Sequence, residues 1–264
     1  MADVPRFKLT VEYAGTRYSG WQKQTNARTV QGEIERAIAE ATGERSTEFQ
    51  GSGRTDAGVH ALRQIAHLDL RRGQPLEALR RRLNDELPSD INILSISSVP
   101  HRFHARHSAV ARSYLYQVSR RRSAFAKPFV WWVKDVLDLD RMQAAAACFV
   151  GLHDFRSFSD DDPESKSTEV LVDRVDVADH GDLVLIRVQG SHFIWKMVRR
   201  MVGVMVEVGR GAMPVAAVES LLLTSSAEPA RLTAPASGLF LERVFYEGDR
   251  RDWSLHAAVA VPSE

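Results

Sequence analysis

Cysteine is almost absent from this chain of 264 residues, with Cys148 as its only example. A single cysteine cannot form an internal disulfide, so the composition favours a reducing compartment, and we expect a cytoplasmic protein. Cys148 lies in an apolar helical run over residues 144–150. That position predicts a core residue rather than a nucleophile.

Long apolar runs are also missing. No stretch of the sequence approaches the roughly 20 apolar residues that a membrane-spanning helix needs. Residues 1–5 lack the basic and then apolar pattern of a signal peptide. We therefore expect no association with a membrane.

Metal-ligand signatures are weak. His101, His104 and His107 recur every third residue, but arginines stand between them and no cysteine or carboxylate pattern completes a site. The sequence therefore predicts no metal centre.

Charge of the two signs is balanced in total and unevenly placed. The net charge is +1, yet residues 1–133 carry 21 Lys and Arg against 13 Asp and Glu, whereas residues 134–264 carry 14 against 21. A basic first half suits a phosphate backbone, although arginines that merely face water would give the same count. The runs that create the excess are Arg71–Arg72, Arg80–Arg82, Arg102–Arg112 and Arg120–Arg122.

The periodicity predicts two series of strands and helices. Strand-like segments lie at 7–13, 46–49, 64–70, 91–99, 113–119, 130–133, 169–177, 183–188 and 243–246. Apolar residues at helical spacing indicate helices at 30–41, 76–83, 139–150, 194–208 and 215–223. We predict an α+β fold of two similar subdomains, 1–107 and 108–264, with helices packed on a mixed, mostly antiparallel sheet and a ligand cleft between them.

The most distinctive stretch is the glycine-rich loop over residues 51–61, which holds Arg54, Thr55 and Asp56 between two expected strands. Such a loop suits a catalytic side chain, but Asp56 could equally bond the backbone of its own turn. The segment Tyr18–Gln24 also has two possible roles, because its aromatic rings suit either base stacking or the edge of a core.

The segment Gly53–His60, which reads Gly-Arg-Thr-Asp-Ala-Gly-Val-His, resembles the central motif of the tRNA pseudouridine synthase A family. Further segments in the expected order are similar to other motifs of that family: Tyr18–Gln24, Phe103–Arg106, Arg112–Tyr116, Gly151–Phe158, Ile194–Gly203 and Thr233–Leu241.

This resemblance implies the pseudouridine synthase fold, a central RNA-binding cleft and a homodimer that binds tRNA. It implies isomerisation of uridine to pseudouridine at positions 38, 39 and 40 of the anticodon stem-loop, without a cofactor. By the same resemblance, Asp56 is the nucleophile or base, and Arg199 pairs with it. Tyr114 lies against the uracil, Leu239 packs under it, and Arg54 fills the space that the flipped nucleotide leaves.

Two other functions fit parts of the sequence. A non-catalytic RNA-binding module would use the basic first half and leave Asp56 dispensable. An aspartate-dependent glycosidase would need a second carboxylate facing the bond, and only one lies in the motif.

Three further expectations concern the second half. Arg200 is expected to be an ordinary surface arginine, and the tail after Tyr246 to be accessory. The acidic loop over residues 160–165 is expected to be mobile and to avoid or gate phosphates.

Overall fold

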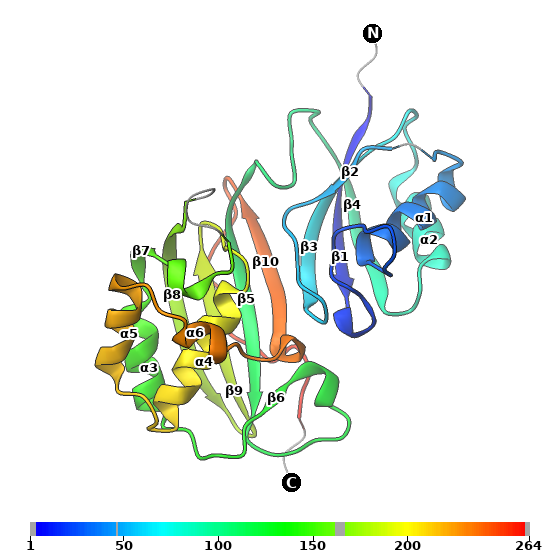
Figure 1. The fold of residues 1–264 in the computed structure, drawn as a ribbon. Helices are drawn as coiled ribbons and strands as arrows, with labels where there is room; N and C mark the ends of the chain where they lie inside the picture. Colours follow the sequence, from blue (N-terminus) through cyan, green and yellow to red (C-terminus); the bar gives the residue numbers. More distant parts are fainter. Residues whose placement is uncertain (1–3, 46, 162–166, 262–264) are drawn as a thin grey trace. The chain divides into compact units, whose positions relative to one another are not determined.

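The computed structural model describes residues 4–45, 47–161 and 167–261. The chain forms two compact units (Figure 1). The first comprises Met1–Val110 with Leu241–Arg250, and the second Ala111–Phe240 with Arg251–Glu264. Residues 241–250 thus group with the first unit, whereas the sequence division placed them in the C-terminal part.

The first unit is built on antiparallel strands in the order β4-β1-β3, with the short β2 paired to β3. Their bounds are β1 Arg6–Tyr13, β2 Phe49–Gly51, β3 His60–Asp69 and β4 Ile91–Val99. Phe7, Leu9, Val11 and Tyr13 are buried and alternate with half-buried polar residues, as expected for a sheet with one face against a core.

Helices α1 (Val30–Thr42) and α2 (Leu76–Glu86) lie on one face of this sheet (Figure 1). The hydroxyl of Thr29 accepts a hydrogen bond from Gly32 N at 3.2 Å and caps α1. Gly43 ends the helix with φ 74°, a conformation that glycine adopts without strain.

The sheet of the second unit follows the antiparallel order β5-β9-β8-β7, with β6 parallel to β5. The strands are β5 Ala109–Ser119, β6 Trp131–Trp132, β7 Gly151–Asp154, β8 Glu169–His180 and β9 Leu183–Gly190. Strand β10, Leu239–Tyr246, crosses the division between the units. The predicted mixed, mostly antiparallel α+β fold is confirmed.

Helices α3 (Leu139–Cys148), α4 (Met197–Gly209) and α5 (Val215–Leu223) lie on one face of this sheet, with the short α6 (Glu228–Arg231) beside them (Figure 1). Eleven of the thirteen residues of α4 are buried. A Cβ on Gly203 would lie 1.7 Å from Leu232 O, so only glycine permits this approach of backbone to helix.

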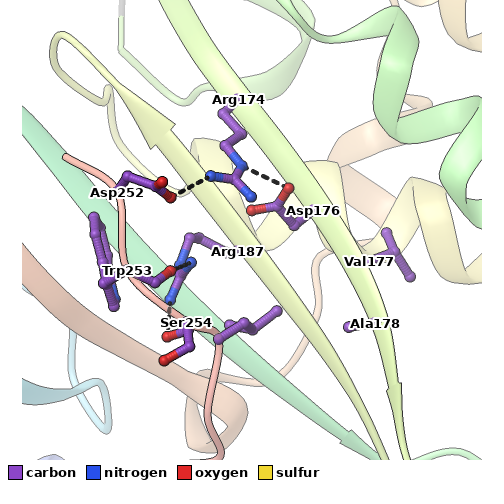
Figure 2. A pocket seen from close by; sticks show the side chains of 9 residues that line it. Arg174, Asp176, Val177, Ala178, Arg187, Asp252, Trp253 and Ser254 are labelled. Atoms are coloured by element: carbon purple, nitrogen blue, oxygen red, sulfur yellow. Dashed lines mark hydrogen bonds and ion pairs between the residues drawn. The ribbon is translucent and has the colours of Figure 1, made fainter.

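The C-terminal tail is fastened to the second unit by two buried side chains. Gln117 accepts from Ala258 N at 2.6 Å and donates to Val259 O at 3.4 Å. Arg187, only 1% exposed, donates to Trp253 O at 3.1 Å and Ser254 O at 3.2 Å (Figure 2). The tail thus satisfies polar groups on β5 and β9 that burial would otherwise leave costly.

Two local expectations need correction. The helix predicted from residue 194 begins at Met197, because Lys196 has φ 63°, which no α-helical residue adopts. Cys148 is half-buried rather than a core residue, and its thiol donates to Ala144 O at 3.4 Å. Burial raises the pKa of this thiol, which disfavours the thiolate that a nucleophile needs.

Candidate active site

Arg54 and Asp56 lie on the loop that joins β2 to β3. The Arg54 side chain is exposed and Asp56 is half-buried. The aspartate and the residue before it are fixed through the backbone, because Trp21 N donates to Thr55 O at 3.1 Å and Val59 N donates to Asp56 O at 3.1 Å. The Asp56 carboxylate is therefore carried on a backbone that hydrogen bonds hold in place.

Buried side chains hold the same loop. The hydroxyls of Tyr13 and Thr55 are 2.8 Å apart. Gln64, which is fully buried, accepts from Ser52 Oγ at 2.6 Å and donates to Gly53 O at 3.0 Å. Groups on β1 and β3 thus fix Thr55 and the two residues that precede Arg54.

Glycines allow the loop to approach its neighbours closely. A Cβ on Gly15 would lie 1.9 Å from Val59 O, and one on Gly51 would lie 2.6 Å from the Trp21 ring. Trp21 is 2% exposed and Tyr18 4% exposed. The aromatic rings of Tyr18–Gln24 therefore belong to the core beneath the loop, and the base-stacking interpretation of them is wrong.

Tyr114 lies on β5 in the second unit and is half-buried. Its ring meets that of Phe193 edge to face, with centroids 5.1 Å apart. Tyr116, two residues on, is fully buried and donates its hydroxyl to Pro235 O at 2.7 Å. Of the two tyrosines, Tyr114 is thus the one with surface left to meet a ligand.

Arg199 projects from the first turn of α4. Its Nε donates to Ala234 O at 2.7 Å, and its own carbonyl accepts from Ala234 N at 3.1 Å. Five residues beyond this double contact, Leu239 begins β10 and is 5% exposed. Two hydrogen bonds therefore join Arg199 to the segment that leads to Leu239.

Arg200 is not the surface arginine expected from the sequence. It is 3% exposed and forms an ion pair with Asp160. Lys196 Nζ donates to the other oxygen of the same carboxylate at 2.6 Å. These contacts place Asp160 in the structure of the second unit, while residues 162–165 of the expected mobile loop lie outside the described residues.

The five predicted side chains fall into two groups. Arg54 and Asp56 share a loop of the first unit. Tyr114, Arg199 and Leu239 belong to β5, α4 and β10 in the second. The predicted joint action of the two groups on one base stays a prediction.

A basic cavity of about 260 Å³ lies in the first unit, and no linear pattern of residues predicted it. Lys8, Arg63, Arg243 and Arg250 line it from three strands and the turn after β10, with Asp249 as the acidic residue among them. The carboxylate of Asp249 accepts a hydrogen bond from Tyr246 N at 2.8 Å. Cations from separate strands meet here, which suits a phosphate group.

Two of the arginine runs noted in the sequence, 80–82 and 120–122, are, by contrast, partly paired at the surface. Arg80 and Arg81 both contact Glu77, and Arg120 and Arg121 contact Asp179 and Asp182. Their charge is partly neutralised locally, so the runs overstate the basic surface.

Three histidines, His67, His104 and His107, bring their rings into contact at tilted angles. Centroids are 4.6 Å apart for His67 and His104, and 4.3 Å apart for His104 and His107. Nδ1 of His67 accepts from Ala105 N, and Nδ1 of His104 accepts from the backbone of Arg106. These nitrogens are therefore committed to the backbone, and no group of metal-binding side chains occurs among the described residues.

None of the helices in the described ranges has the length and hydrophobicity needed to cross a bilayer.

Comparison with known proteins identifies the class. A family model described as tRNA pseudouridine synthase matches residues 9–108 and 145–247. Both the Asp56 loop and the Arg199 helix lie within the matched residues. The chain belongs to the tRNA pseudouridine synthase family, as the motif over residues 53–60 predicted.

Curated relatives agree over nearly the whole chain. The tRNA pseudouridine synthase A of Afipia carboxidovorans is 41% identical over 246 residues, covering 92% of this chain and 100% of the relative. That of Nitrobacter winogradskyi is 42% identical, covering 93% and 97%. That of Sinorhizobium fredii is 40% identical, covering 92% and 100%. The resemblance stated from the sequence is confirmed.

Proposed function

We propose that this chain converts uridine to pseudouridine at positions 38, 39 and 40 of the tRNA anticodon stem-loop, with Asp56 as nucleophile or base. The observation that carries the proposal is the placement of Asp56, half-buried in the family's motif on a loop whose backbone is fixed at Thr55 and at Asp56 itself. A fixed carboxylate suits catalysis, because no free energy is then spent on ordering it during the reaction.

The reaction is an isomerisation. The bond between N1 and C1′ breaks, the uracil turns, and a bond forms between C5 and C1′. The ring loses a proton at C5 and gains one at N1, so atoms and electrons balance without an oxidant or a cofactor. A single carboxylate, at the sugar or at the ring, is sufficient for this chemistry.

The other predicted residues take supporting roles. Arg199, whose Nε is held by Ala234 O, pairs in this proposal with the Asp56 carboxylate and orients it. Tyr114 and Leu239 hold the two faces of the uracil while it turns. Flipping a uridine out of a stem costs a few kcal/mol, and the exposed Arg54 fills the vacated space.

The basic cavity of the first unit supports RNA as the substrate. Lys8, Arg63 and Arg250 have no ion pair within the described parts of the chain. Their charge is available to phosphates, and each phosphate contact makes binding more sensitive to salt. We propose in addition that the protein acts in the cytoplasm and as a homodimer. The mass of the purified protein in solution would test the dimer.

The test combines purified protein, unmodified tRNA and mapping of pseudouridine along the strand. We expect modification at 38–40, and a loss of at least about 10³-fold in rate for Asp56→Asn with tRNA binding retained. Normal turnover in this variant would exclude Asp56 as the catalytic group.

Other outcomes of the same experiment separate the alternatives. Tight binding by both proteins without product would favour a non-catalytic RNA-binding module. Release of free uracil would indicate a glycosidase. Pseudouridine at other positions would keep the chemistry and overturn the choice of substrate region.

A further inference from the structure

Trp195 is a large aromatic residue that folding leaves half outside the core. It lies in the turn before α4 and is 50% exposed. Two residues before it, Phe193 packs against Tyr114, and four residues after it comes Arg199. The exposed ring therefore belongs to the segment that carries the proposed uridine-contacting residues of the second unit.

The position of Trp195 is fixed by charged groups. Its backbone N donates to Asp161 Oδ2 at 3.1 Å. The ammonium of Lys196 lies 4.7 Å from the centre of its ring and is itself held by Asp160 at 2.6 Å. A cation at this distance is attracted to the electron-rich face of an indole. The ring is thus held in place although half of it faces solvent.

The backbone next to Trp195 is strained at Lys196. Lys196 adopts φ 63°, and it is the only non-glycine residue with positive φ in the described ranges. This conformation costs about 1 kcal/mol or more for a residue with a Cβ. Its consequence is a turn that places Trp195 outside the helix, ahead of the first residue of α4.

We propose that Trp195 stacks on a base of the RNA substrate next to the target uridine. This inference rests on the proposed function and adds a substrate contact to it. A held, half-exposed indole presents a flat apolar surface, and every nucleobase has a face that can stack on it.

The chain offers a matched control in Trp132. That residue also belongs to the second unit, is 43% exposed, and has a cation over its ring, with the Arg122 guanidinium carbon 6.0 Å from the centroid. It differs in lying on β6, where it pairs with Ser119 of β5, five residues beyond Tyr114 along that strand. Trp132→Ala therefore removes similar exposed area from a place where we propose no RNA contact.

The experiment measures the Kd for unmodified tRNA and the KM and kcat of pseudouridine formation. For Trp195→Ala we expect Kd and KM to rise about 5- to 150-fold, the range for loss of one stacked base, with a smaller change in kcat. Trp195→Phe keeps a stacking ring and is expected to stay within about 3-fold of the wild type. Trp195→Leu keeps apolar area without a ring and is expected to resemble Trp195→Ala.

Trp132→Ala is expected to leave Kd and KM unchanged. Wild-type KM in Trp195→Ala, equal effects at both tryptophans, or full rescue by leucine would each overturn the stacking role while leaving the proposed function intact. Absence of pseudouridine with the wild-type protein would overturn the proposed function, and this inference with it. Unchanged thermal unfolding of the four variants would establish that the differences lie in binding.

Discussion

The loop that carries Asp56 and the turn that carries Arg199 are fixed by different forces. The loop is held by neutral contacts: backbone hydrogen bonds to Trp21, the hydroxyl pair of Tyr13 and Thr55, and a close approach at Gly15. The start of α4 is held by ions, with Asp160 joining Lys196 to the buried Arg200.

This difference has consequences for how each region responds to change. Contacts that depend on shape are sensitive to a single added carbon atom and insensitive to pH. Ion pairs tolerate small changes of shape but depend on the protonation of the carboxylate. Four predictions test the contrast, from the largest expected effect to the smallest.

Gly15→Ala should be the most damaging change. The new Cβ would lie 1.9 Å from the carbonyl oxygen of Val59, so the backbone beneath the Asp56 loop has to move. We expect a loss of about 3 kcal/mol or more in the free energy of unfolding, measured with urea. Gly73→Ala, with no atom within 4 Å of its Cβ, should stay within about 0.5 kcal/mol of the wild type. Equal stability of the two variants would contradict steric control of the loop.

Arg200→Met should come next. It removes a buried cation from Asp160 and keeps a side chain of similar length, so we expect a loss of about 2 kcal/mol in stability and a fall in kcat. Arg231→Met breaks an exposed pair with Glu228 and should cost less than about 0.5 kcal/mol. Urea unfolding and turnover of both variants test this prediction. Similar losses of stability in the two would show that burial does not strengthen the contribution of the Arg200 ion pair.

Tyr13→Phe should have a smaller effect. It leaves the buried hydroxyl of Thr55 without this partner, at a cost of about 1 kcal/mol. In a double-mutant cycle with Thr55→Val, the paired change should destabilise less than the sum of the single changes. Strict additivity would show that the 2.8 Å contact contributes nothing to the loop.

The smallest effect should be the response to acid. Hydrogen bonds from Lys196 and then Arg200 lower the pKa of Asp160 below its ordinary value of 3.8. A lowered pKa in the folded state means that this stabilisation is complete above about pH 4 and is lost as the pH falls through the folded-state pKa. Unfolding midpoints at pH 7, 4 and 3 should therefore fall less steeply in Asp160→Asn than in the wild type. Identical acid profiles would contradict the assignment.

Much of the fold could be predicted because its patterns are local. The strand at 91–99 and the helix at 215–223 have the predicted bounds, since alternation and helical spacing are visible along the chain. The family motif located Asp56 in the same way. The start of α4 could not be predicted, because the left-handed conformation of Lys196 depends on Asp160 and Asp161, more than thirty residues earlier.

Charge was the least predictable property of the site. The runs at 80–82 and 120–122 stand out in the sequence, but their partners Glu77, Asp179 and Asp182 neutralise much of them. The cavity around Lys8 and Arg63 draws its cations from separate strands, so no linear pattern announces it. The burial of Arg200 was not predicted for the same reason. The sequence of a helix does not show whether an arginine faces solvent or pairs with a carboxylate on a distant loop.

The grouping of residues 241–250 with the first unit bears on how the protein is made. During synthesis the chain emerges from its N-terminus, and domains tend to fold as they emerge. The first unit stays incomplete until residue 250 has left the ribosome, after nearly all of the second unit has been translated. The first unit therefore cannot complete its folding before most of the second unit has been translated. The Asp56 loop belongs to an incomplete unit until translation is almost over.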